Sequence, residues 1–112
     1  MINIRVDQNL NIVYVDISGY ITNEESNLFL EKHKKITKDL RISQYKLVVI
    51  PSKFECENDI KSVCISLYKS GYKKIYMVDP KGYIINTVPL SYIEKKMFTK
   101  VVNIVKSLDN IK

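Results

Sequence analysis

The sequence predicts a single α/β domain in which a mixed sheet is built around a strand at residues 46–51. Residues 47–50 are four successive apolar side chains, a pattern typical of a strand buried on both faces. Apolar residues recur with helical spacing before and after this strand, and they alternate with polar residues in two stretches near the N-terminus. A strand buried on both faces needs helices above and below it, and these patterns offer them. We expect most of the helical cover on one face.

Length and composition agree with one domain over residues 1–112. A chain of 112 residues is too short for two cores. No apolar run reaches the roughly 18 residues that a membrane span requires. Residues 1–7 lack the basic and then apolar layout of a secretory signal. We therefore expect a cytoplasmic protein without a membrane span.

The charge of the chain raises the question of nucleic-acid binding. The formal net charge is +6, but the lysines are scattered and the only arginines are Arg5 and Arg41. No stretch interleaves aromatic and basic residues as single-strand binders do. These features favour a solvated basic surface, and a nucleic-acid-associated or phage-borne accessory protein is the alternative hypothesis.

The N-terminal third is predicted to form a hairpin followed by a helix. Residues 2–7 and 12–18 alternate between apolar and polar, which indicates two antiparallel strands. Thr22 and Glu25 have the spacing of a capping box at the start of a helix over about 23–40.

His33, the single histidine, lies on the apolar stripe of this predicted helix, with Phe29 and Ile36. A catalytic or metal-binding histidine needs companions, and none is near it in the sequence. We interpret His33 as a residue at the edge of the core with one hydrogen-bond partner.

The centre of the chain is predicted to contain the end of the buried strand, a loop and a second helix. Pro51 removes a donor and ends the strand, and residues 52–57 form a loop. Asn58 or Asp59 caps the helix, and Gly71 ends it in a left-handed conformation. The apolar positions of the helix are Ile60, Val63, Cys64, Leu67 and Tyr68.

The two cysteines are too few for a disulfide framework and too far apart for a zinc pair. Cys64 falls on the apolar stripe of the second helix and is expected to be a buried, inert thiol, whereas Cys56 falls in the predicted loop and is expected to be more exposed.

Residues 75–78 form a second apolar run after this helix, so they should pair parallel to the central strand through a right-handed crossover. Two alternatives remain for the last third. Either residues 83–88 form a strand and a capping box at 91–94 opens a helix to about 108, or a helix over about 86–98 precedes a strand at 100–105.

This order of elements resembles the STAS domain, the fold of bacterial anti-sigma-factor antagonists. Residues 16–22 resemble its strand that ends in a glycine before the first helix, and residues 47–52 resemble its central strand. Residues 72–79 and 102–107 are similar to its later strands. The resemblance implies a mixed sheet of four to five strands with three helices, and it favours the reading with a strand at 100–105 and only a stub of a final helix at 108–112.

The resemblance also implies a non-catalytic protein-interaction module in bacterial regulation. The phosphorylatable serine motif of the signalling members is absent; Asp59 would stand near its position, and Ser62 is the nearest hydroxyl. The surface implied is the second helix and the loop before it. Phe54 is its candidate apolar anchor if exposed, and the alternative is that Phe54 packs over the strand end. The residues of this predicted surface are Lys53, Phe54, Glu55, Glu57, Asp59, Lys61 and Ser62.

Glu55, Glu57 and Asp59 form an acidic cluster that Asp79 could join to hold Mg²⁺ at the carboxyl edge of the sheet. Exposed carboxylates at a helix start need no metal, and no phosphate-binding glycine-rich loop accompanies them. We therefore expect no metal, no cofactor and no catalytic residue, and a protein as the partner. The sequence leaves a homodimer open.

Overall fold

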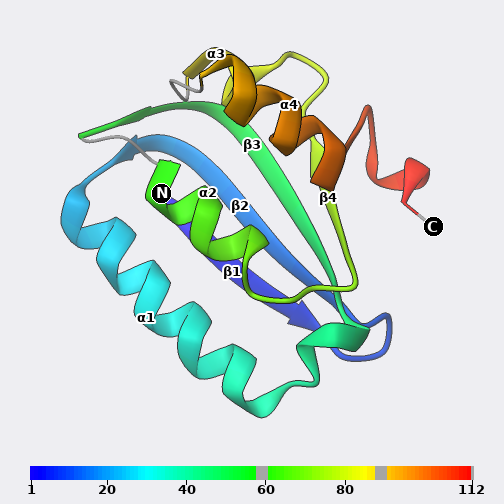
Figure 1. The fold of residues 1–112 in the computed structure, drawn as a ribbon. Coiled ribbons are helices and arrows are strands. Elements are labelled where there is room, and N and C mark those ends of the chain that lie inside the picture. Colours follow the sequence, from blue (N-terminus) through cyan, green and yellow to red (C-terminus); the bar gives the residue numbers. More distant parts are fainter. Residues whose placement is uncertain (58–60, 88–90, 112) are drawn as a thin grey trace.

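The computed structural model describes residues 1–57, 61–87 and 91–111, which form a five-stranded mixed sheet with helices packed on it (Figure 1). The strands are β1 (Ile2–Asp7), β2 (Ile12–Ile21), β3 (Lys46–Cys56), β4 (Lys74–Val78) and β5 (Val102–Val105), and they lie side by side in that order. β1 is antiparallel to β2, and all other neighbours are parallel. The predicted hairpin, the central position of β3 and its parallel pairing with β4 are confirmed.

The helices pack on one face of the sheet. They are α1 (Asn23–Asp39), α2 (Lys61–Tyr68), α3 (Tyr83–Thr87) and α4 (Tyr92–Val101), with short 3-10 turns at Ile42–Gln44 and Leu108–Asn110. Phe29 of α1, Val63 of α2, Ile84 of α3 and Phe98 of α4 all join one core with the sheet. Right-handed crossovers between strands that follow one another across the sheet place every connecting helix on the same side.

The expectation that helices cover mostly one face is confirmed, whereas the argument that the strand at 46–51 needs helices both above and below it is wrong. On the face away from the helices, Val48 is fully buried within a small cluster with Ile12 and Tyr76. Ile111, after the last 3-10 turn, packs against this cluster. The apolar run at residues 47–50 therefore reflects burial by neighbouring side chains on one face and by helices on the other.

β3 continues through the region predicted to be a loop. Ile17 of β2 pairs with Pro51, but the next register is Gly19 with Phe54, so β3 has one extra residue at this point. Such a bulge shifts the alternation of side chains by one residue. Phe54 therefore faces the helices, as Leu47 does, instead of the opposite face.

Pro51 does not end the strand because its pairing with β4 has already ended. The β3–β4 ladder stops at Val49 and Met77, whereas the ladder with β2 continues to Cys56. A proline is tolerated where a strand has become an edge.

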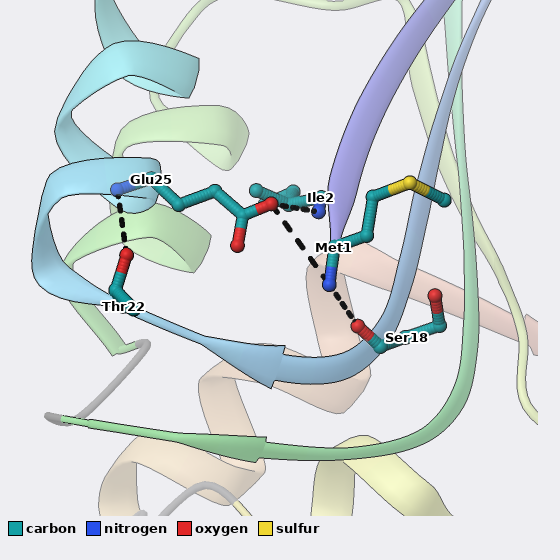
Figure 2. Close-up of polar contacts among 5 residues, drawn as sticks. All are labelled: Met1, Ile2, Ser18, Thr22 and Glu25. Atoms are coloured by element: carbon teal, nitrogen blue, oxygen red, sulfur yellow. Dashed lines mark hydrogen bonds and ion pairs between the residues drawn. The ribbon is translucent and has the colours of Figure 1, made fainter.

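The first predicted capping box is only half formed, as Figure 2 shows. Thr22 Oγ1 accepts from the Glu25 N–H at 3.1 Å, as predicted. The Glu25 carboxylate accepts instead from the Ile2 N–H at 3.2 Å and lies 3.9 Å from the Met1 nitrogen, which itself donates to the Ser18 carbonyl. Glu25 thus ties the start of β1 to α1.

The last third combines parts of both alternatives. The second capping box is complete, because Ser91 Oγ accepts from the Glu94 N–H and the Glu94 carboxylate accepts from the Ser91 N–H. The helix that it opens ends at Val101, and β5 follows at once, which confirms the predicted fifth strand. The strand predicted from residue 83 is wrong, because residues 83–87 are helical.

Two smaller features complete the comparison with the expected elements. Gly71 has a φ of +95°, which confirms its left-handed conformation after α2. Asn58 and Asp59, the predicted caps of α2, lie outside the described residues. No helix in the described part of the chain has the length and apolar character needed to cross a membrane.

Candidate interaction surface

An apolar groove lies between α2 and α4 on the described surface. Its volume is about 90 Å³. Positions 61, 64, 65 and 68 share one face of α2, and positions 94, 98 and 101 share one face of α4, because both sets follow the helical repeat. The lining residues are Lys61, Cys64, Ile65, Tyr68, Glu94, Phe98, Val101 and Val102.

An ion pair joins the two walls of the groove. The Lys61 ammonium contacts the Glu94 carboxylate, so the two helices are linked by charge as well as by packing. The hydrogen bond from Lys61, followed by that from the Ser91 N–H, lowers the pKa of Glu94. Glu94 therefore stays ionised while it caps α4.

A second hollow of about 20 Å³ lies between the helices and the sheet, with Val63, Leu67 and Met77 in its walls. Cys64, Tyr68, Phe98 and Val102 line both spaces. An apolar hollow of about this size holds at most one water molecule.

The structure divides the predicted surface into three parts. Lys53 and Glu55 are exposed on the last part of β3, Glu57 is exposed directly after it, and Ser62 is exposed on the first turn of α2. Lys61 is turned into the groove. Asp59 lies outside the described residues.

Phe54 is a correction to that surface. It is 5% exposed and belongs to the main core, so it is not an exposed anchor, and the alternative that it packs over the strand end is right. The bulge in β3 is the cause. Cys64 also differs from expectation, since it is half-buried in the groove, and Cys56 is half-buried at the end of β3.

Sequence reasoning missed the residues of the α4 wall. Glu94, Phe98 and Val101 join the groove only because α4 lies beside α2, and the sequence left the last third undecided. The capping box at Ser91 was the signal that could have placed this helix.

Two carboxylates of the supposed magnesium cluster serve the backbone instead. Asp79 is 4% exposed and accepts from the N–H groups of Tyr83 (2.8 Å) and Ile84 (2.9 Å) at the start of α3. Glu57 accepts from the Asn23 N–H at 3.0 Å, at the start of α1. Within residues 1–57, 61–87 and 91–111, no group of three or more potential metal ligands occurs.

Within the described residues, His33 has one hydrogen-bond partner, as the sequence led us to expect. Its Nε2 lies 2.6 Å from the Tyr72 hydroxyl, and its ring stacks on Phe29 with centroids 6.0 Å apart. Burial lowers the pKa of His33 and raises that of Tyr72. The imidazole is therefore neutral at pH 7 and engaged inside the core.

No family model matches the chain, and no match was found among curated proteins.

Proposed function

We propose that this chain is a non-catalytic protein-interaction module of bacterial regulation, which binds a partner protein at the groove between α2 and α4. The groove is the observation that carries the proposal. Its volume of about 90 Å³ is well below the roughly 300–1,000 Å³ of small-molecule sites. A space of this size suits one apolar side chain of a partner, which is how protein interfaces place their anchors.

The charge of the two helices that wall the groove indicates the chemistry of the partner segment, although Lys61 and Glu94 are the only described charged residues that line the groove itself. α2, the residue after it and α4 together carry the lysines Lys61, Lys69, Lys95, Lys96 and Lys100 against a single acidic residue, Glu94. A partner segment with carboxylates flanking an apolar side chain complements this surface, and complementary charge favours the correct encounter.

The position of the histidine supports binding rather than catalysis. His33 is the only histidine of the chain, and its ring is buried against Phe29 and Tyr72. It is therefore not placed to activate a nucleophile at the surface.

The regulatory part of the proposal rests on the resemblance to STAS domains. In that resemblance the second helix and the loop before it contact the partner, and here α2 forms one wall of the groove. The chain would act in the cytoplasm in the manner of an anti-sigma-factor antagonist, without its phosphorylatable serine.

Selection of peptides from a displayed random library on the immobilised full chain tests the proposal. We expect the enriched peptides to share an apolar residue flanked by Asp or Glu. Their affinity for an Ile65→Lys variant should fall by about tenfold or more, because the substitution places a charge in the anchor site.

Leu10→Lys is the matched control, because it adds the same charge at an exposed apolar residue in the β1–β2 turn. Enriched peptides that bind Ile65→Lys as tightly as the parent chain would contradict the proposal. Tight binding of single-stranded DNA or RNA that weakens steeply with salt would support the alternative function instead.

A further inference from the structure

The outer edge of β1 and the adjacent face of α1 form a second surface. It lies at the edge of the sheet opposite β5. β1 has a strand neighbour on one side only, in the described strand order. Beside it a groove of about 140 Å³ separates β1 from α1. Two apolar side chains of these elements are open to solvent, Leu28 at 58% and Val6 at 36%. The groove is lined by Ile2, Asn3, Ile4, Glu25, Leu28, Phe29 and Lys32.

The hydrogen bonds at the start of β1 show which backbone groups face outward. Met1 and Ser18 exchange two backbone hydrogen bonds, so the backbone N–H and C=O groups of Met1 point toward β2. The N–H of the next residue, Ile2, points away from β2 and donates to the Glu25 carboxylate (Figure 2). Along two antiparallel strands, residue pairs that exchange backbone hydrogen bonds alternate with pairs that do not.

This alternation directs the backbone groups of Ile4 and Val6, like those of Ile2, toward the open edge. The same three side chains face the helices, because their partners on β2 are the core residues Ile17, Val15 and Val13. At Ile4 and Val6 the edge thus offers hydrogen-bonding groups beside an apolar strip, whereas the Ile2 N–H is engaged by the Glu25 carboxylate.

β1 carries little of the usual protection of an edge strand, since the Glu25 carboxylate covers only the Ile2 N–H at its start. It contains no proline, glycine or lysine, and its register with β2 has no bulge. Its one cation, Arg5, is drawn toward β2, where it pairs with Asp16 at 2.9 Å and lies over the Tyr14 ring at 4.7 Å from the centroid. An edge of this kind invites another strand.

We infer that β1 pairs antiparallel with β1 of a second copy of this chain, about a two-fold axis at Ile4. In this register Ile4 faces Ile4 of the second copy, and Ile2 faces Val6, so apolar side chains meet along the helix-covered face. Arg5 then lies opposite Asn3. If the two-fold axis lay at Arg5 instead of Ile4, the two Arg5 side chains would lie opposite each other, and this pairing of like charges is unfavourable.

The charges of α1 fit the same axis. The two-fold brings the two α1 helices together antiparallel, with the exposed Leu28 side chains next to each other. Glu24 and Lys32 lie four residues on either side of Leu28, and both are exposed. Each Glu24 therefore meets Lys32 of the other copy, as expected of a self-complementary interface.

Sedimentation equilibrium over a range of protein concentrations tests this inference. We expect the parent chain to reach twice its mass of 13.1 kDa. Val6→Pro should yield a monomer, since it removes an N–H that faces the open edge and keeps the bonds to β2. Leu28→Glu should also yield a monomer, because it places two like charges together. Ile93→Glu, at an exposed position of α4, is the matched control and should remain dimeric.

Charge reversal tests the orientation of the helices. Glu24→Lys should weaken the dimer by about threefold or more, and adding Lys32→Glu should restore it. A parent chain that stays monomeric at every concentration would overturn the inference. So would a dimer that survives both Val6→Pro and Leu28→Glu, or a double charge reversal no tighter than the single one. None of the substituted residues lines the groove between α2 and α4, so the proposed function stands or falls separately.

Discussion

At the scale of single residues, two buried aromatic rings hold the helices to the sheet. Phe54 packs into the core from the last part of β3. His33 fixes α1 to Tyr72, just before β4. The helical spacing of His33 already predicts a position at the edge of the core. Phe54 lies among charged residues, so local rules favour exposure there, and long-range packing decides its burial.

Replacing Phe54 measures its role in the core. Phe54→Ala should lower the free energy of unfolding by about 3–5 kcal/mol, because a buried aromatic side chain is lost and leaves a cavity. Lys53→Ala, at the exposed neighbour, should change it by less than about 0.5 kcal/mol. Urea unfolding of both variants checks this. A loss below about 1 kcal/mol for Phe54→Ala would mean that the ring is not buried in solution.

The buried His33 predicts a fall in stability at acidic pH. Its pKa in the folded chain is lowered by burial, so the unfolded chain binds the proton more readily. This contribution is complete above the unfolded pKa of about 6.5 and is lost as pH falls below it, by no more than about 1.4 kcal/mol per pH unit.

The control for this prediction is the double variant His33→Phe with Tyr72→Phe, which keeps the packing and removes the titrating group. Chemical unfolding between about pH 7 and pH 5 should show a flatter profile for the double variant than for the parent. An unchanged profile would contradict the assignment, since the chain has no other histidine.

At the scale of elements, the bulge in β3 decides which side chains face the helices. Ser52 and Lys53 together lie opposite Ser18, between the pairs that Ile17 and Gly19 make with β3. Gly19 has a φ of +67°, a conformation that glycine adopts without strain and that suits an irregular ladder. The bulge brings Phe54 and Cys56 back to the helix side.

Two deletions test the bulge. Without Ser52, regular alternation from Pro51 still points Phe54 toward the helices. Without both Ser52 and Lys53, the ring should face the other side. We expect the double deletion to be less stable than the single one by at least about 1.5–3 kcal/mol, the value of burying such a side chain. Equal stabilities in urea unfolding would show that the bulge does not set the direction of Phe54.

The elements also show where sequence reasoning stops. The apolar runs and the alternation at the N-terminus are local signals, and they predicted the first four strands. The capping spacing at Ser91 offered the start of α4 in only one of two alternatives. The sequence predicts that the strand ends at Pro51, and this is wrong. A strand can continue through a proline where its hydrogen-bonded ladder with a neighbour has already stopped, and the sequence does not show where the ladder with β4 stops. Glu25 has the spacing of a capping box, but its carboxylate accepts from the N–H of Ile2 in β1, 23 residues away in the sequence.

At the scale of the whole molecule, the sheet offers one candidate surface at each side. The α2–α4 groove lies toward β5, and the edge of β1 with α1 lies at the opposite side. A dimer formed through β1 would carry two α2–α4 grooves, one on each chain, and the dimer contact would cover neither of them. The sequence predicted α2 as part of a surface, but a groove needs a second wall, which only the tertiary arrangement supplies.

The most direct test of the central claim is a methyl NMR spectrum of the full chain, with and without a peptide enriched on it. We predict that the peptide shifts the methyl signals of Ile65, Val101 and Val102, which line the groove. The signals of Ile12 and Val48 on the helix-free face should stay unchanged. Shifts confined to the helix-free face, with the groove signals unmoved, would contradict the claim that partners bind between α2 and α4.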